Sequence, residues 1–466
     1  MTSPLLTLPL LLCLGQVSEP TSTNSALQAR LSFFASDQDV DTEGSTTSFH
    51  AALEGHTPEL ASGLRAEAAL SLFLSNGGNS QTFGLVDNGS TLSLRYRPSN
   101  WESQEGVVLA VHPLSTTRLY MGFTYPVTWE RKAFSNRAST ESALELRLSR
   151  RRWEAFAALK SAEVLDSLRL ETSRRYALLA GGFVDVTPEL RLALKGTVLN
   201  RGQVPGVGTL GIEMHVPVRG ASLGGAWHHG VPVGNNVDLA LYTGDPTFFE
   251  RFFVPETYPG GFGASVSLEG SLVSQGLQDP EASTFQPKTQ TSTAGALEGR
   301  VKQGFWRAHA LVYLRTPGFI QADVPGIPPF QAFRSSADTQ PEVSGTLSSD
   351  YHIQDWGLTP GLLLRFTRPA SFRQSVLGVP APDWTTVLLG PNQLSILPEG
   401  VEPKTAVTVK ATARWDLGAV AGVLAEASFT HDPNRATFEN DETGVSRPVL
   451  RPANAVGFSV LLQARF

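Results

Sequence analysis

The last fourteen residues decide the fold of this chain: residues 453–466 read A-N-A-V-G-F-S-V-L-L-Q-A-R-F. From Phe466 back to Val456 every second residue is apolar, whereas the intervening positions are mostly polar or small. Successive side chains of an extended strand point to opposite faces, so this stretch predicts a strand with one wholly apolar face. Such a face suits contact with lipid. The apolar row consists of Phe466, Ala464, Leu462, Val460, Phe458 and Val456.

The same alternation of apolar and polar residues recurs along most of the chain. Residues 142–160 show it in two runs separated by a short polar stretch, which is the pattern of a hairpin. Helical spacing would scatter such rows over several faces, so extended strands are predicted. Most runs have about ten residues, the length that crosses a bilayer as a tilted strand. The clearest runs are residues 27–36, 64–75, 142–160, 190–198, 294–302, 306–314, 358–366 and 407–415.

The connections between these runs alternate between short and long. The tetrapeptide T-P-E-L occurs at residues 57–60 and again at 187–190, each time between two runs. Short turns at one end and long loops at the other are typical of membrane barrels. Other tight turns are expected at residues 303–304, 355–357 and 416–418, and long connections at residues 37–45, 316–340, 369–404 and 431–452.

The composition fits strands that have one apolar and one polar face. Charged residues make up 17% of the 466 residues and the mean hydropathy is -0.07, whereas an ordinary soluble protein has roughly 25% charged residues. Membrane barrels combine scarce charge with ordinary hydropathy because only alternate residues meet lipid. The net charge of -6 argues against nucleic acid as a partner.

The N-terminus predicts export from the cytoplasm. Residues 5–14 form an apolar run that is too short for a spanning helix but suits the core of a signal peptide. We predict a signal peptide at residues 1–15, a short periplasmic lead at 16–26 and one barrel domain at 27–466. Cys13 is the only cysteine, so the mature chain would lack disulfides and thiolate metal sites. Leu12 occupies a position where a lipoprotein signal has a small residue, which argues against lipidation.

The terminal strand resembles the C-terminal strand of bacterial outer-membrane β-barrel proteins, which end in an aromatic residue, almost always Phe. This resemblance implies that the barrel-assembly machinery recognises the strand and inserts the chain into the outer membrane, in contact with its lipid. The residues that match this assembly signal are Phe458, Val460, Leu462 and Phe466.

We therefore predict an all-β fold: a single transmembrane antiparallel β-barrel of about 18 strands, within a range of 16 to 22, with short periplasmic turns and long outer loops. An even number keeps both chain ends in the periplasm. A soluble propeller or tandem β-sandwiches would also alternate, but the sequence has no repeat of roughly 40 residues as blades require.

The polar rows of the strands predict a charged lumen that leans basic. A basic wall would favour anionic solutes or acidic polymers. Equally, the cations could pair with neighbouring carboxylates and only stiffen the wall. The lumen-lining candidates are Arg30, Arg65, Arg147, Arg191, Lys195, Arg300, Lys302, Arg307, Arg365, Lys410 and Arg414.

Aromatic residues predict two further features. Trp153, Trp306, Trp415, Tyr120 and Tyr125 fall near the ends of predicted strands, where the aromatic girdles of membrane barrels lie, although ordinary packing would also explain each one alone. A second group lies in an aromatic connection that we expect to fold into the bore as a constriction or to rest on lipid, with local packing as the simpler explanation. Its members are Phe248, Phe249, Phe252, Phe253 and Tyr258.

Motifs for cofactors, metals and catalysis are weak. Residues 206–211, G-V-G-T-L-G, match the dinucleotide fingerprint, but an alternating run follows in place of the required helix. His228 and His229 are adjacent, so in a strand they would face opposite sides and could not readily share a metal. We expect no cofactor, no metal and no catalytic site, although a barrel enzyme with scattered residues remains an alternative.

The sequence thus favours a porin-like passive conduit in the outer membrane. A finer hypothesis, motivated by chain length, basic lumen and aromatic loops, is export of a secreted polysaccharide with a periplasmic polymer-export complex as partner. The alternative from another class is a non-conducting scaffold or adhesin in an envelope complex. Oligomeric state, permeant and direction of transport stay open.

Overall fold

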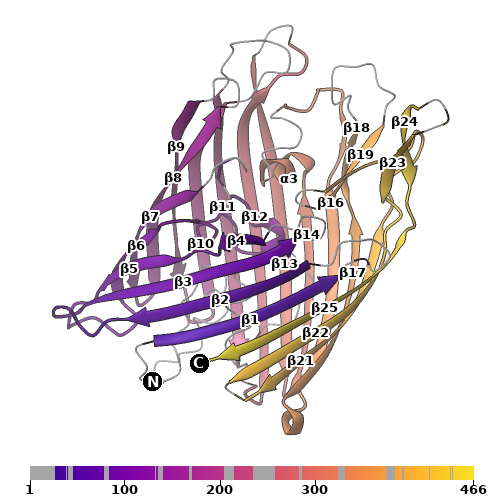
Figure 1. Ribbon diagram of the computed structural model, residues 1–466. Coiled ribbons are helices and arrows are strands. Elements are labelled where there is room, and N and C mark those ends of the chain that lie inside the picture. The colour runs from indigo at the N-terminus through magenta and orange to yellow at the C-terminus, as the bar shows by residue number, and fades with distance from the viewer. Residues whose placement is uncertain are drawn as a thin grey trace.

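The computed structural model describes residues 27–37, 39, 46–77, 83–131, 133–134, 140–166, 171–203, 215–234, 258–282, 286–323, 331–373, 384–390, 393–418, 420–440, 442 and 444–466. The predicted signal peptide and lead, residues 1–26, lie outside them. The described strands run alternately up and down in one continuous wall (Figure 1). The first ten are β1 (Leu27–Asp37), β2 (Thr46–His56), β3 (Leu64–Gly77), β4 (Phe83–Asp87), β5 (Thr91–Tyr96), β6 (Gly106–His112), β7 (Glu141–Arg150), β8 (Trp153–Asp166), β9 (Glu171–Asp185) and β10 (Leu190–Gln203).

The wall closes on itself. β1 pairs with both β2 and β25, and the backbones of Ala29 and Phe466 exchange hydrogen bonds of 3.1 and 2.8 Å. β4 and β5 both pair with β3, end to end, so together they fill one position. The wall of described strands is thus a closed antiparallel barrel with 18 strand positions, as predicted. We call each position a stave, whether one strand or two strands end to end occupy it. The remaining wall strands are β11 (His215–Gly230), β12 (Phe262–Gln278), β13 (Pro287–Gln303), β14 (Trp306–Arg315), β16 (Glu342–Tyr351), β17 (Leu358–Arg368), β21 (Ala406–Leu417), β22 (Ala421–His431) and β25 (Asn454–Arg465).

The two faces of the wall have opposite polarity, inverted relative to a soluble protein. On β11, for example, Leu223 is 62% exposed on the outer face while its neighbour Ser222 is fully buried on the inner face. Buried lysine, arginine, glutamate and serine side chains line the inside of most staves, and exposed leucine, valine and phenylalanine cover the outside. This arrangement suits a barrel surrounded by hydrocarbon. No helix among the described residues is long and apolar enough to cross a membrane.

Connections at the two ends of the barrel differ in length. The end that carries Phe466 has short turns, including residues 151–152 and 304–305, and we name it the turn end. The opposite loop end carries the long connections that the sequence predicts. The connection between β11 and β12 is an exception: β11 ends and β12 begins at the turn end, yet residues 231–261 separate them in the sequence. In membrane barrels the turn end faces the periplasm.

Tryptophans form a girdle at the turn end. Trp153 and Trp306 begin β8 and β14, Trp415 lies near the end of β21, and all three are more than 40% exposed on the outer face, as predicted. Trp227 and Trp356, which were not among the predicted girdle residues, extend the same belt. The Trp415 indole donates to the backbone carbonyl of Trp356 at 2.9 Å. Such amphipathic rings mark the level of the membrane interface.

Small elements stand on the loop end beside β16, β17 and β22 (Figure 1). A four-stranded sheet has the order β15-β18-β19-β20, and β23 pairs with β24 as a separate hairpin. Ile320, Ala370, Phe372 and Leu388 form a small buried core between the sheet and α3. The elements are α3 (Pro317–Asp323), β15 (Asp338–Gln340), β18 (Ala370–Arg373), β19 (Thr385–Gly390), β20 (Gln393–Ile396), β23 (Ala436–Asn440) and β24 (Ser446–Leu450). The 3-10 turn η3 (Gln354–Trp356) lies instead at the turn end, between β16 and β17.

The lipid-facing side of the wall should not tolerate charge. We expect Leu268→Arg, at the middle of β12 and 63% exposed, to lower the free energy of unfolding by about 2–4 kcal/mol because the guanidinium enters hydrocarbon. Leu60→Arg, in a turn and 58% exposed, is the matched control and should change it little. Urea titration in phospholipid vesicles measures both. Equal stability of the two variants would contradict the assignment of this face to lipid.

Candidate functional site

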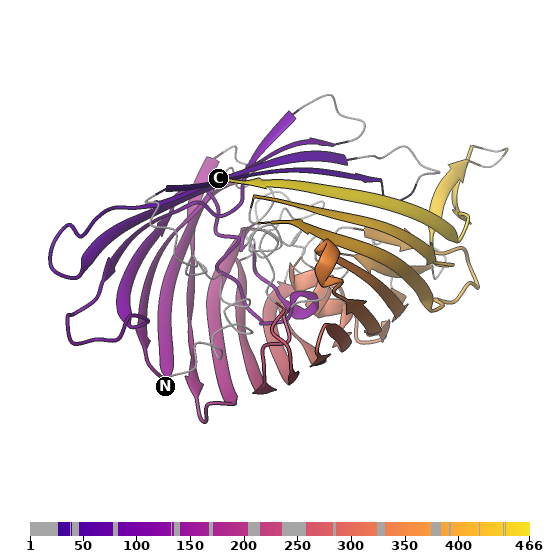
Figure 2. The same ribbon diagram turned by 90° about the horizontal axis from the view of Figure 1, so that it is seen from below.

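A loop of the chain crosses the interior of the barrel. The inner loop, defined as described residues 113–131, 133 and 134, follows β6 and precedes β7. Met121 and Trp129 exchange backbone hydrogen bonds of 2.9 and 3.1 Å, which fold the segment between them into a hairpin. Its tip is the 3-10 turn η1 (Tyr125–Val127), which includes Pro126. Seen from below, this hairpin lies between the walls of the barrel (Figure 2).

Two oppositely charged side chains of the wall hold the backbone of the inner loop. The Glu269 carboxylate on β12 accepts hydrogen bonds from the amides of Phe123 and Thr124 at 2.8 and 2.6 Å. The Lys195 ammonium on β10 donates to the carbonyls of Gly122 and Tyr120 at 2.9 and 3.3 Å. Charge-assisted bonds to both donors and acceptors of one turn fix its position. Lys195 and Glu269 are each under 5% exposed.

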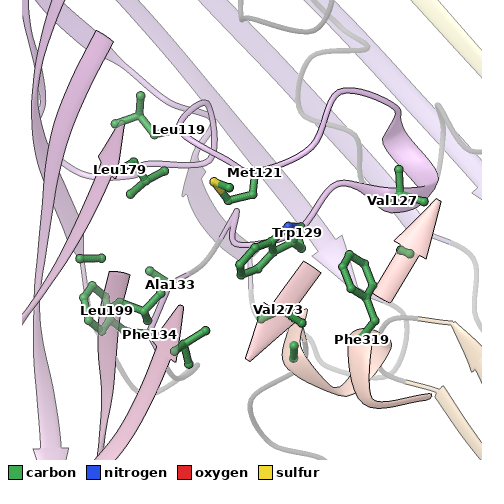
Figure 3. Close-up of a cluster of buried hydrophobic side chains, with 14 of the residues drawn as sticks. Leu119, Met121, Val127, Trp129, Ala133, Phe134, Leu179, Leu199, Val273 and Phe319 are labelled. Atoms are coloured by element: carbon green, nitrogen blue, oxygen red, sulfur yellow. The ribbon is translucent and has the colours of Figure 1, made fainter. Parts of the chain in front are cut away.

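Trp129 anchors the hairpin against the same part of the wall, on β11 between β10 and β12. It is fully buried, and its indole donates to Ser222 Oγ on β11 at 3.3 Å. Its ring lies over Gly220, where a Cβ would come within 2.4 Å of the ring. Phe319 of α3 packs edge-on with a centroid separation of 6.2 Å. Figure 3 shows Trp129 between Met121, Val273 and Phe319, so apolar residues gather inside a barrel whose wall is polar.

The tip of the hairpin reaches across the interior of the barrel to a distant strand. The Arg315 guanidinium on β14 donates to the carbonyl of Pro126 at 3.0 Å and also pairs with Glu342. β14 lies eight staves from β6 in the sheet order. In a barrel of 18 staves this is nearly the full width, so the inner loop divides the bore.

The first part of the inner loop packs against the interruption between β4 and β5. Between β4 and β5 the side chain of Asp87 accepts hydrogen bonds from the amides of Gly89 and Ser90 at 3.0 and 3.2 Å. Gly89 has a φ of 84°, which favours glycine. The Arg118 side chain lies directly over Gly89, where a Cβ would meet it at 2.7 Å, and its Nε is 3.5 Å from the carbonyl of Asn88. The irregular stave thus makes room for the loop.

Glu130 gives the inner loop a buried carboxyl. Its backbone has a φ of 63°, the one positive value among described non-glycine residues, and a conformation of this kind persists where the surroundings impose it. Thr197 Oγ1 donates to the carboxylate at 3.1 Å, and Lys160 donates to the backbone carbonyl at 2.9 Å. Burial raises the pKa of Glu130 to about 7, while the positive charges of Lys160 and Arg201 oppose the rise.

Docking of the inner loop should therefore depend on pH. A carboxyl with a raised pKa in the docked state stabilises that state fully below its ordinary value of 4.5, and the contribution is lost as pH rises through 7. We expect the loop to be held more firmly at about pH 5 than at about pH 9. Single-channel recording in planar bilayers should then show lower noise in the open-channel current at the lower pH. Glu130→Gln, which does not ionise, should reduce this difference. An unchanged pH response of the variant would exclude Glu130 as its source.

Most of the predicted lumen cations lie beside carboxylates. Arg307 on β14 makes a bidentate pair with Asp350 at 2.7 and 2.8 Å, and both side chains are buried. Lys195 holds the inner loop instead, Lys302 lies 5.6 Å from the Tyr258 ring centroid, and Arg365 donates to Thr346 at 3.0 Å. The paired candidates are Arg30 with Glu54, Arg65 with Glu59, Arg147 with Glu145 and Glu154, Arg191 with Asp185, Arg300 with Glu298, Arg307 with Asp350, Lys410 with Glu426 and Arg414 with Asp416.

Of the aromatic group expected in a constriction, the structure describes one member. Tyr258 stacks parallel on His352 with ring centroids 3.7 Å apart, and its hydroxyl is 3.0 Å from Thr359 Oγ1. The Arg307 guanidinium lies 4.9 Å from the same ring. The G-V-G-T-L-G stretch at residues 206–211 lies outside the described residues. So do the other members of the aromatic group, Phe248, Phe249, Phe252 and Phe253.

The assignment of Tyr120 and Tyr125 to the membrane girdle was wrong. Both belong to the inner loop, and Arg131 of the same loop lies 4.2 and 5.8 Å from their ring centroids. Tyr120 is only 4% exposed. Strand-end aromatics look alike in sequence whether the following loop turns outward or inward. The anchors Glu269 and Ser222 were missed because they fit the ordinary polar row of their strands.

The described residues contain no group of three or more His, Cys, Asp or Glu that could hold a metal ion. His228 faces the interior, where its Nε2 lies 3.1 Å from the carbonyl of Gly230, and His229 is exposed on the outer face. The adjacent histidines thus point to opposite sides of the wall.

No protein-family model matches the sequence, and no curated protein matches it. Among solved structures, the chain is similar to the outer membrane protein OprD from Pseudomonas aeruginosa, with 12% identity and a TM-score of 0.45 over 94% of this chain and 92% of that chain. OccAB1 from Acinetobacter baumannii gives 9% and 0.49 over 94% and 95%. The outer membrane protein opdK from Pseudomonas aeruginosa gives 7% and 0.47 over 94% and 98%.

The location follows from the barrel itself. Only helices and closed barrels satisfy every backbone hydrogen bond within lipid. This barrel closes through β1 and β25, has an apolar exterior, and carries a tryptophan belt at one interface. The chain has the fold of an outer-membrane β-barrel, and its apolar outer face is in contact with lipid.

Proposed function

We propose that the chain is a passive outer-membrane channel whose bore is narrowed by the inner loop. The observation that carries this is a wall of 18 staves with a polar, charged inner face, because a barrel of this size can enclose water. Lys195, Glu269 and Trp129 hold the loop across that bore, so it sets the path that a solute must take. The lumen-lining role of the basic candidates is part of this proposal.

Planar-bilayer recording of the purified protein tests the proposal. We expect discrete current steps in potassium chloride, altered by variants of the inner loop. A protein that inserts with the heat-modifiable gel mobility of a folded barrel, yet gives no open or gateable current, would contradict the channel.

The channel should have a weak preference for anions over cations. Eight of the eleven candidate cations lie beside a carboxylate, so the wall carries far less net charge than the basic row alone suggests. A charged wall selects through its net potential. Reversal potentials in a salt gradient measure this directly, and a strong preference for cations would contradict the proposal.

Polysaccharide export with a periplasmic polymer-export complex is the finer proposal. It is supported by the width of the barrel and by the basic residues around Tyr258 at the turn end. An anionic oligosaccharide, such as an oligomer of galacturonic acid, should block the current from the turn side in a length-dependent way. Passage of small anions without any block by the oligomer would limit the channel to small solutes.

A scaffold or adhesin is the second candidate. It is favoured by the four-stranded sheet and the β23–β24 hairpin, which form a structured surface at the loop end. Deleting residues 436–450 would separate the two functions: a channel keeps its conductance, whereas an adhesin loses binding of its partner to intact cells.

A further inference from the structure

One arginine of the wall points away from the lumen. On β11 the inner face carries Val218, which is fully buried, and Ser222. Arg219 lies on the opposite face with Ala221 and Leu223, and all three are exposed. Its guanidinium is therefore on the side of the barrel that meets the membrane.

Two hydroxyl side chains lie in register with Arg219. Arg219 pairs with Ser274 of β12, and Ser274 pairs with Thr291 of β13. Paired residues of antiparallel strands share a face, and neighbouring strands are about 4.8 Å apart. One guanidinium and two hydroxyls thus stand side by side on the outer surface of three consecutive staves.

This row marks the loop-end boundary of the apolar band. One step toward the turn end, Ala221 pairs with Leu272, which is 47% exposed. Toward the loop end the outer face of β13 continues with Thr289 and Pro287, which are exposed and not aliphatic. On β9 the exposed ring of Tyr176 lies just beyond Leu178 toward the loop end, as an interfacial aromatic does. Arginine on a lipid-facing wall costs little at such a boundary and much more at the midplane.

The partner of Arg219 must come from outside the described chain. No described residue makes a hydrogen bond or ion pair with its side chain, whereas Arg174, on the outer face of β9, pairs with Glu163 at 2.8 Å. Most arginines of the inner wall are likewise matched with carboxylates. At the level of the headgroups a guanidinium meets phosphate, which its planar fork binds with two parallel hydrogen bonds.

We propose that Arg219, with Ser274 and Thr291, binds the phosphate of a phosphorylated glycolipid of the lipid A class. The turn end faces the periplasm, so the loop-end boundary lies in the outer leaflet, where this glycolipid resides. The acyl chains then lie along the leucines toward the turn end, and the two hydroxyls complete the ring of donors around the phosphate.

Native mass spectrometry of the purified barrel, titrated with bisphosphorylated lipid A in a neutral detergent, tests this proposal. We expect Arg219→Ala to weaken binding about tenfold or more, as for loss of a charge-assisted bidentate contact. Arg219→Lys keeps the charge and should lose less. Arg174→Ala, on the same outer face but ion-paired, is the matched control and should bind like the wild type. Unchanged heat-modifiable gel mobility verifies that each variant is folded.

Three outcomes would overturn the proposal. The first is equal lipid A binding by wild type and Arg219→Ala. The second is equally tight, Arg219-dependent binding of phosphatidylglycerol, which would assign the site to an anionic phospholipid. The third is a change in the oligomeric mass of Arg219→Ala with lipid binding intact, which would assign the row to contact between copies of this chain.

Discussion

Replacing Trp129 by Ala should release the inner loop from the wall and increase the single-channel conductance. Trp129 is fully buried, hydrogen-bonded to Ser222 and packed against Phe319. Losing a buried tryptophan side chain costs about 3–5 kcal/mol, enough to leave the hairpin undocked for much of the time. Limited trypsin digestion in detergent gives an independent readout, because Arg131 of the loop should become a cleavage site.

Paired controls separate loop docking from barrel stability. Trp153→Ala removes an exposed tryptophan of the girdle and should leave conductance unchanged. Gly220→Val keeps the indole but adds a side chain whose Cβ would lie only 2.4 Å from the Trp129 ring. At Gly270, on the outer face of β12, an added Cβ would have no other atom within 4 Å. Gly220→Val should therefore copy Trp129→Ala, and Gly270→Val should not. If Gly220→Val behaves like wild type in both assays, the tryptophan does not hold the loop.

Arg307→Ala should destabilise the barrel and shift its selectivity toward cations. Removing one partner of a buried ion pair costs about 3–5 kcal/mol, since the other charge stays buried without compensation. Asp350, buried beside Arg307 at 2.7 Å, is that charge. Urea titration in vesicles measures the stability, and reversal potentials measure the change in wall charge.

The double variant Arg307→Ala with Asp350→Ala should recover much of the stability and restore the selectivity. Arg65→Ala is the surface control: Arg65 and Glu59 are 3.7 Å apart and 48% exposed, and such pairs contribute about 0–1 kcal/mol. An Arg307 variant no less stable than the Arg65 variant would show that the Arg307 pair has no structural role.

The sequence was sufficient to predict the wall of the barrel. Alternation with period two records which side chains meet lipid, because hydrocarbon tolerates only apolar residues at every outward position. That constraint is local, so Leu146 and Glu145 could be assigned to opposite faces from their neighbours alone, and Leu146 is 52% exposed whereas Glu145 is buried. Turn and loop lengths then identified the two ends of the barrel, and the number of staves lay at the predicted value.

The site inside the barrel could not be predicted in the same way. The inner loop depends on contacts between residues far apart in sequence, such as Glu269 with Phe123 and Arg315 with Pro126. No periodicity records these contacts, and a buried lysine that holds a loop has the same place in the pattern as one that lines a bore. Glycine at positions 220 and 224 of the inner row was the available signal, because both positions face large rings, Trp129 and Phe123.

The distances along the chain between the inner loop and its anchors also set an order of assembly. Ser222, Glu269 and Arg315 lie 93 to 189 residues beyond the loop groups they bind. A chain that enters the membrane strand by strand therefore has no docking surface for the loop until β11, β12 and β14 are in place. Closing such long segments is slow compared with forming adjacent hairpins. The wall must take shape first, and the narrowing of its interior is among the last events of folding.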